Sequence, residues 1–262
     1  MDRHSENKAL LIVSHPGHEL RIHHWLERAK PLVLVLTDGS GSSEHSRLSS
    51  TTALLASAGA TPGPIYGRFA DRDIYSALVK KDISLFCGLL YDIVSILAEE
   101  EIALVAADAL EYYNPSHDLC RYLTGTAIEI VQRQTGRVVQ NFDFTLTASP
   151  DACPPDSRNR ALCLSLDESA LQRKLAASRG YPGLAGEIDT ALRLHGLDAF
   201  RRECLRPVAN HLGVCDRPAA QPFYERHGEA RVREGFYSEV IRFSNHMQPI
   251  AEALWEEALA TA

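Results

Sequence analysis

The chain has 262 residues, of which 45% are hydrophobic and 23% charged, so its composition is that of a globular protein with a sizeable core. Its formal net charge is −7 and its basic residues are dispersed, which argues against binding to nucleic acids or to anionic membrane surfaces. No apolar stretch approaches the roughly 18 residues that a transmembrane helix needs.

The beginning of the chain and its cysteines indicate a cytoplasmic protein. Residues 1–8 carry charges of both signs and lead directly into an apolar run, unlike a secretory signal. The cysteines are scattered and no two form a C-x-x-C pair, so we expect free thiols rather than disulfides or a zinc knot. They are Cys87, Cys120, Cys153, Cys163, Cys204 and Cys215.

The first third of the chain alternates between strand and helix patterns. The apolar run at 9–14 predicts a buried strand, and the apolar face of 19–30 predicts a helix that Pro31 ends. A β-branched run at 32–36 predicts a second strand. Small residues at 37–43 indicate a loop, and a helix is expected at 46–58.

The middle of the chain continues this alternation. A 3.6-residue period predicts a long helix at 82–101, followed by a strand at 102–106. A polar loop leads to a helix at 117–134, and 138–146 has β character. Strands and helices that alternate at this spacing predict an α/β, Rossmann-like three-layer fold with a mostly parallel sheet.

The pattern changes after Pro150. Residues 162–166 suggest one last strand, and the chain beyond Asp167 is predicted to be mainly helical, with breaks at Pro182, Pro207 and Pro218. No linker separates a second core. We therefore predict a single domain over residues 1–262, with a Rossmann-like core at 8–150 and a helical extension packed on it at 151–262.

Polar residues follow three of the predicted strands. His15 and His18 lie three positions apart after the first strand, and His117 opens the helix that follows a later strand. Parallel strands bring such loops to one edge, where three histidines with an open fourth position would suit a hydrolytic zinc ion. Taken singly, each histidine also fits an ordinary polar role in a turn or at a helix start.

The order of these segments along the chain is similar to that of a known protein family. The sequence reads H-P-x-x-E at 15–19, T-D-G at 37–39 and x-P-x-H at 114–117, with a short acidic loop at 69–73. Over roughly residues 9–134 it resembles the PIG-L/LmbE-like family. The resemblance implies a Rossmann-like fold and zinc-dependent N-deacetylation of N-acetylglucosamine-type sugar conjugates.

The resemblance also assigns metal ligands. The usual first motif of the family is H-P-D-D-E, whose first histidine and second aspartate bind the metal; those roles fall on His15 and His18. His117 keeps the role of the last histidine in the family's H-P-D-H. The resemblance thus implies one zinc ion per chain, in a site whose net charge is one unit higher because histidine replaces aspartate.

Two departures from the family motifs affect the expected chemistry. The general base of the family is replaced by Gly17, and removal of a general base commonly costs about 10²–10⁴-fold in rate. Asn114 replaces a histidine that steadies the oxyanion, and an amide still donates a hydrogen bond. Three other carboxylates are candidates for the missing base: Glu19, Asp38 and Asp118. Their alternative roles are to support the ligand loop (Glu19), to close a loop turn (Asp38) and to occupy the first turn of a helix (Asp118).

Substrate-binding candidates also follow from the resemblance. Arg47 aligns with an arginine that family members often have near the site, although the glutamate usual three positions later is Ser50 here. Asp71 and Arg72 lie in the short acidic loop. A lone G-x-G at 39–41 is too weak a signal for a dinucleotide-binding site.

The sequence therefore predicts a metal-dependent hydrolase that cleaves an N-acyl amide of a small sugar-like or amino-sugar substrate. The alternative is a catalytically inactive family member that binds a sugar-like ligand without turnover, because Gly17 cannot accept a proton. We expect a small-molecule substrate and no nucleic-acid or membrane partner. The sequence leaves homo-oligomer formation, the substrate and the acyl group open.

Overall fold

The computed structural model of the chain describes residues 8–41, 45–211, 214 and 217–261. Of the features noted above, residues 1–7, part of the loop at 37–43 and Cys215 lie outside these ranges. No helix within the described ranges is long and apolar enough to span a membrane.

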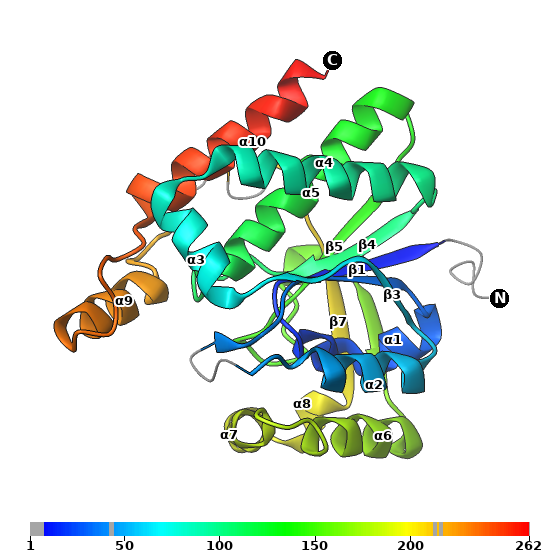
Figure 1. Cartoon of the computed structure of the whole chain (residues 1–262). Helices are drawn as coiled ribbons and strands as arrows, with labels where there is room; N and C mark the ends of the chain where they lie inside the picture. The colour runs from blue at the N-terminus through cyan, green and yellow to red at the C-terminus, as the bar shows by residue number, and fades with distance from the viewer. Residues whose placement is uncertain (1–7, 42–44, 212–213, 215–216, 262) are drawn as a thin grey trace.

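The described residues form a seven-stranded sheet in the order β3-β2-β1-β4-β5-β7-β6 (Figure 1). The five strands from β3 to β5 are parallel, whereas β7 pairs antiparallel with both β5 and β6. This arrangement confirms the predicted α/β class with a mostly parallel sheet. The strands are β1 (Ala9–Val13), β2 (Leu32–Thr37), β3 (Thr61–Phe69), β4 (Leu104–Asp108), β5 (Gln140–Phe144), β6 (Leu162–Ser165) and β7 (Arg202–Pro207).

Helices cover both faces of the sheet and make three layers (Figure 1). One face carries α3 (Asp71–Lys80), α4 (Ile83–Glu99), α5 (Pro115–Thr135) and α10 (Gln248–Ala260). The other face carries α1 (His23–Ala29) and α2 (Leu48–Ala58). Beyond α1 lie α6 (Glu168–Arg179), α7 (Ala185–His195) and α8 (Leu197–Phe200), while α9 (Phe223–Arg233) lies near α3.

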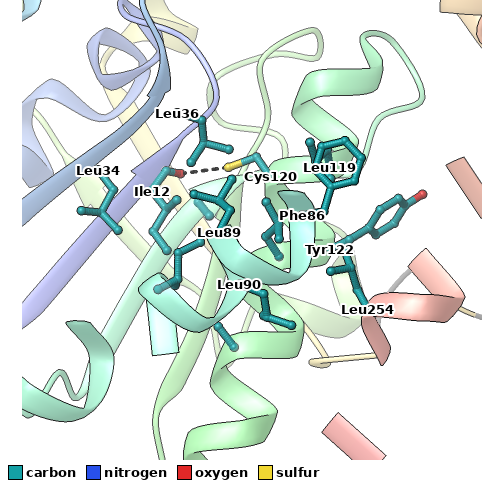
Figure 2. Close-up of a cluster of buried hydrophobic side chains, with 14 of the residues drawn as sticks. Ile12, Leu34, Leu36, Phe86, Leu89, Leu90, Leu119, Cys120, Tyr122 and Leu254 are labelled. Atoms are coloured by element: carbon teal, nitrogen blue, oxygen red, sulfur yellow. Dashed lines mark hydrogen bonds between the residues drawn. The ribbon is translucent and has the colours of Figure 1, made fainter. Parts of the chain in front are cut away.

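The central strands are buried on both faces, which explains their continuous apolar runs. In β1, Leu10 and Ile12 pack toward α4 and α5, whereas Leu11 and Val13 pack toward α1. Figure 2 shows the first of these clusters, in which the Sγ of Cys120 donates to the carbonyl oxygen of Ile12 at 3.7 Å. This thiol is a core side chain, as expected for a free cysteine.

The region between α2 and α4 differs from its prediction. The sequence pattern predicts no strand there and a loop at 69–73, but the structure contains β3 and begins α3 at Asp71. Pro62 and Pro64 obscured the strand, because proline is excluded from central strands and tolerated only at edges. β3 is such an edge strand, and its pairing with β2 has two register shifts.

The extension after Pro150 contains a second difference. The sequence predicted mainly helix beyond Asp167, whereas Arg202–Pro207 is strand β7, and Pro207 lies at its end. Three consecutive residues of this strand, 203–205, are buried, and the strand inserts between β5 and β6. Only pairing with two distant strands reveals it, because its own sequence is polar and short.

Two predicted helices have different boundaries. The helix predicted from residue 117 begins at Pro115, with Asn114 as N-cap. The helix predicted at 19–30 is divided into a 3-10 helix, His18–Ile22, and α1. Both differences lie at the first turn, where local capping rather than periodicity sets the boundary.

A buried ion pair attaches the extension to the core. The Nζ of Lys174 in α6 lies 2.8 Å from Oε1 of Glu203 in β7, and it also donates to the carbonyl oxygen of Arg21. Glu203 further accepts hydrogen bonds from the backbone N–H groups of His24 and Trp25, at the start of α1. One buried carboxylate thus joins β7, α6 and α1.

Candidate metal centre

Three imidazole rings meet at the carboxyl ends of β1 and β4. The ring centroids of His15 and His18 are 5.4 Å apart, those of His15 and His117 are 5.1 Å apart, and those of His18 and His117 are 4.6 Å apart. His15 and His117 are buried, and His18 is partly exposed. Residues about one hundred positions apart in the chain therefore share one small volume, as the parallel-sheet argument predicted.

The loop that carries two of these rings is fixed by Gly17 and Glu19. Gly17 has a φ of 106°, a conformation that favours glycine. The buried Glu19 accepts hydrogen bonds from the Gly17 N–H at 2.8 Å and from the Thr51 hydroxyl at 2.7 Å. Burial raises the pKa of Glu19, while these hydrogen bonds oppose the rise. Both carboxylate oxygens are engaged in holding the loop to α2.

His15 is anchored through its Nδ1 atom. This atom lies 2.8 Å from the hydroxyl oxygen of Thr37 and 2.9 Å from Oδ1 of Asp71. The Thr37 hydroxyl donates to the carbonyl oxygen of Ser14 and therefore accepts from His15, so this contact and the nearby negative charge of Asp71 favour a proton on Nδ1 and a lone pair on Nε2. Burial alone would raise the pKa of Asp71, but His15, Thr37 and the Gly41 N–H lower it well below its usual value.

His18 is anchored in the same manner by Asp108, the last residue of β4. Its Nδ1 lies 3.0 Å from each carboxylate oxygen of Asp108. Asp108 also accepts from the backbone N–H and the hydroxyl of Ser14, at 2.8 and 2.7 Å. Burial alone would raise the pKa of this fully buried group, but the charge and hydrogen bond of His18 bring it well below its usual value.

His117 reaches the cluster from the first turn of α5. The Asn114 side chain caps this helix by accepting from the Ser116 N–H at 2.8 Å, and Pro115 occupies the first helical position. Among the described residues, the buried Nδ1 of His117 has no hydrogen-bond partner. Burial, and then the neighbouring His18 and His15, hold the pKa of His117 well below its usual value, so the ring is neutral.

This arrangement has the features of a ligand set for a divalent metal ion. Imidazoles that bind one tetrahedral zinc ion through nitrogens about 2.1 Å away have ring centroids about 5 Å apart, close to the spacing seen here. Carboxylates that accept from Nδ1 orient the Nε2 atom of metal-binding histidines. A buried ring nitrogen without a partner among the described residues, as in His117, also fits a histidine whose partner is an ion.

The ring centroids have the spacing of a zinc site, but the ring nitrogens are not all directed at one point. Among the residues that the structure describes, only Cys153, Cys163 and Cys204 offer three ligand atoms that all lie within 4.8 Å of one another. At least one pair of nitrogens in the histidine cluster is therefore more widely separated, and the rings meet edge to face. Binding of one ion by all three histidines therefore requires these nitrogens to move closer together.

The other acids proposed from the sequence have structural contacts. Asp38 closes a turn, because its Oδ1 accepts from the Ser40 N–H at 2.9 Å. Asp118 is fully buried and its Oδ1 accepts from the Tyr112 N–H, while its Oδ2 has no hydrogen-bond partner among the described residues. Burial raises the pKa of Asp118 well above its usual value.

The three residues predicted to bind substrate separate in space. Arg47 donates from Nε to the carbonyl oxygen of Gly39 at 2.8 Å and thereby holds the loop after β2. Asp71 lies against His15, as described, and accepts from the Gly41 N–H at 2.6 Å. Arg72 is exposed on the surface of α3. Asp71 thus contacts the histidine cluster through His15.

Sequence reasoning missed the two side chains that support the histidines, Asp108 and Thr37. Each is the final residue of a central strand adjacent to β1, namely β4 and β2. A polar residue that ends an otherwise apolar parallel strand was the available signal, because the carboxyl edge of such a sheet gathers ligands.

The space beside Gly17 is occupied by the extension. A Cβ atom at this position would lie 2.3 Å from Cδ1 of Leu184 and 3.5 Å from the ring of Tyr181. The Tyr181 hydroxyl lies 2.7 Å from that of Thr51, which fixes its ring there. A side chain at position 17 would therefore require the Leu184 side chain to shift.

Two further surface features lie outside the histidine cluster. A cavity of about 430 Å³ between α2 and the end of α6 is lined by side chains such as Ser50, Leu54 and Tyr181, and by none of the three histidines. Near the Asn114 loop, the rings of Tyr113 and Phe223 stack with centroids 4.5 Å apart. This stack exposes apolar surface beside the start of α5.

Comparisons with known proteins agree with the fold. No protein-family model and no curated protein matches the sequence. The chain is similar to the crystal structure of the A40926 pseudoaglycone deacetylase Dbv21, with 22% identity, a TM-score of 0.53, and coverage of 77% of this chain and 96% of that one.

Two other solved structures are less similar. A triple mutant of a deacetylase of the teicoplanin biosynthetic pathway has 16% identity and a TM-score of 0.49, with 77% of this chain and 97% of that one covered. The conserved protein TT1542 from Thermus thermophilus has 15% identity and a TM-score of 0.48, with coverage of 82% and 99%. The similarity to Dbv21 bears out, at the level of the fold, the resemblance seen in the sequence: this chain and Dbv21 share a three-layer α/β fold.

Proposed function

We propose that this chain is a divergent PIG-L/LmbE-like, metal-dependent hydrolase that removes an N-acyl group, such as acetyl, from a small sugar-like or amino-sugar substrate. The observation that carries the proposal is the meeting of His15, His18 and His117, with ring centroids 4.6–5.4 Å apart. The shared fold with a pseudoaglycone deacetylase supports the same reaction class.

The proposed ligands of a single zinc ion are the three histidines. Such an ion polarises a carbonyl oxygen as a Lewis acid and makes water acidic enough to attack at neutral pH. The chain contributes the orientation of the ligands. Asp108 accepts from Nδ1 of His18 and Thr37 accepts from Nδ1 of His15, with Asp71 at ion-pair distance from the latter, which directs both Nε2 atoms away from these anchors.

The remaining site residues have three proposed roles: donor to the oxyanion, support of the ligand loop, and proton acceptor. Asn114 uses its Oδ1 to cap α5, so its Nδ2 amino group is the donor available to a developing oxyanion beside His117. Glu19 supports the loop, because both of its oxygens accept hydrogen bonds. Asp38 and Asp118 remain the predicted candidates for a proton acceptor in place of the base absent at Gly17.

The test combines metal content with hydrolysis. The purified full-length chain is analysed for metals and then assayed for acetate release from N-acetylglucosamine and its glycosides, with and without a chelator. We expect metal-dependent release that is lost in His18→Ala, because this substitution removes a ligand. His195→Ala, at the end of α7, is the matched control and keeps activity. Full activity of His18→Ala, or indifference to chelation, would contradict the proposal.

A second candidate is supported by the surroundings of Gly17. Gly17 has a positive φ that disfavours an aspartate there, and a side chain at this position would also have to displace the Cδ1 methyl of Leu184. A protein that binds a sugar-like ligand without turnover fits this observation. Binding of an N-acetylated sugar measured by calorimetry, without acetate release and with loss of binding in His18→Ala, would favour this candidate over the hydrolase.

A further inference from the structure

Three cysteines meet on the antiparallel edge of the sheet, away from the histidine cluster. The sulfur atoms of Cys153, Cys163 and Cys204 all lie within 4.8 Å of one another, and those of Cys163 and Cys204 are 2.7 Å apart. Cys204 is buried, Cys153 is half-buried and Cys163 is exposed. The sequence predicted isolated free thiols, because these residues are separated by at least ten positions along the chain.

Strand pairing brings two of these thiols together. Cys163 in β6 and Cys204 in β7 are directly opposite each other in an antiparallel pair, so their side chains leave the same face of the sheet. Cys153 arrives from the segment between β5 and β6, where its thiol lies 3.7 Å from the carbonyl oxygen of Pro154. Two rigid strands and one connecting segment thus supply one sulfur each.

We propose that Cys153, Cys163 and Cys204 form a second metal site, which binds a thiophilic divalent ion of the zinc class through three thiolates. Sulfur atoms about 2.3 Å from one tetrahedral ion are about 3.7 Å apart. All three sulfurs lie within 4.8 Å of one another, and binding of the ion requires Cys163 and Cys204, 2.7 Å apart, to move about 1 Å away from each other. Thiolates select such ions over Mg²⁺ or Ca²⁺, which prefer oxygen ligands. The exposure of Cys163 leaves the fourth position accessible to water.

The binding step is balanced by proton release. Each of the three thiols loses its proton as its sulfur binds the ion, so one divalent ion replaces three protons and no electron is transferred. The third cysteine distinguishes this site from a simple disulfide pair, because oxidation of Cys163 with Cys204 would leave Cys153 unused. The expected role is structural: the ion would fasten the segment after β5 to the β6–β7 edge.

The site is independent of the histidines. β4 and β5 lie between β1 and β7 in the sheet, and strands are spaced about 4.8 Å apart, which places β7 roughly 14 Å from β1. The inference therefore does not depend on the proposed hydrolase, and each can fail without the other.

Cobalt is the probe that separates the two sites. The full-length chain, reduced and freed of metal under anaerobic conditions, is titrated with Co²⁺. We expect sulfur-to-cobalt charge-transfer absorption in the near ultraviolet. It saturates when one Co²⁺ ion is bound per cysteine cluster. The absorption persists in His18→Ala, because histidine ligands do not produce it, and it is lost in Cys163→Ser and in Cys204→Ser. Cys87→Ser, a half-buried cysteine in α4, is the matched control and keeps it.

A second measurement uses the wild-type chain, so that it does not depend on the folding of a variant. Zn²⁺ is added before alkylation, and the modified peptides are identified by mass spectrometry. We expect protection of Cys153 and Cys163, while modification of Cys87 is unchanged. The proposal is overturned if the reduced chain shows neither absorption nor protection. It is also overturned if Cys163 and Cys204 are recovered as a disulfide and their reduction yields no cobalt spectrum.

Discussion

The two proposed metal sites lie on opposite kinds of sheet edge and are built differently. The histidine cluster lies where parallel strands end, and acidic or hydroxyl side chains from β2, α3 and β4 fix two of its rings. The cysteine cluster lies on antiparallel strands, and its sulfurs are already closer together than the histidine nitrogens. Imidazoles need a hydrogen-bond acceptor to set their orientation, whereas a thiolate sulfur needs only position.

This difference shows why only one cluster is recognisable in the sequence. The histidines follow apolar strands at short spacings, as a motif does. The cysteines depend on the register between β6 and β7, which no local pattern contains. Variants that disturb one edge but not the other can test whether the two clusters are independent.

The largest expected effect is at the antiparallel edge. Glu203→Gln leaves Lys174 buried without its carboxylate partner, and removal of one member of a buried ion pair costs about 3–5 kcal/mol. The free energy of unfolding, measured by urea denaturation, should fall by this amount. Glu168→Gln, which disrupts an exposed pair with Arg201, is the control and should change it by less than about 1 kcal/mol. An equal, small effect of both variants would mean that Glu203 does not hold the extension.

An intermediate effect is expected at the parallel edge. Asp108→Asn places an amide NH₂ among donors, because the carboxylate accepts from His18 and from two groups of Ser14. Loss of such a supporting carboxylate typically lowers metal affinity or activity by about 10–100-fold. Zinc affinity measured by competition with a chromophoric chelator checks this.

The same variant should leave the cobalt–thiolate absorption of the cysteine cluster unchanged. Asp92→Asn, in an exposed ion pair with Arg68, is the matched control. Unaltered zinc affinity in Asp108→Asn would exclude a role for Asp108 in orienting His18. A parallel loss at the cysteines would show that the two edges are coupled.

The smallest effect concerns the contact between the parallel half and the segment before α10. The Tyr75 hydroxyl in α3 donates to the carbonyl oxygen of Glu239, and burial, then Tyr237 and Glu239, raise the pKa of Tyr75 to about 12. Between pH 10 and 12 the unfolded state therefore loses this proton before the folded state does. Stability should fall as the pH rises through this window.

The free energy of unfolding should fall by less than the roughly 1.4 kcal/mol per pH unit that one full proton gives, since Tyr75 is only half-buried. Thermal melting at several alkaline pH values measures it, and Tyr75→Phe should have a shallower slope. An identical slope in this variant would assign the alkaline destabilisation to other groups.

The sequence alone determined the parallel half of the fold except for its edge strand β3. β1, β2 and β4 were predicted because strands buried on both faces need uninterrupted apolar runs, and the helix α4 because one face of it must be apolar. The position of His15, His18 and His117 at one edge followed from the same topology. The ligand assignment itself stays a prediction, because the fold similarity does not test it.

Only the tertiary structure decided the rest. β3 and β7 have sequences that favour other structures locally, and long-range pairing overrides that preference. Asp108 and Thr37 are ordinary strand-end residues until the sheet places them against a ring nitrogen. The packing of Leu184 beside Gly17, and the meeting of the cysteines, join residues far apart in the chain. Local sequence sets which elements form, whereas side-chain chemistry at a site depends on distances that only the folded chain fixes.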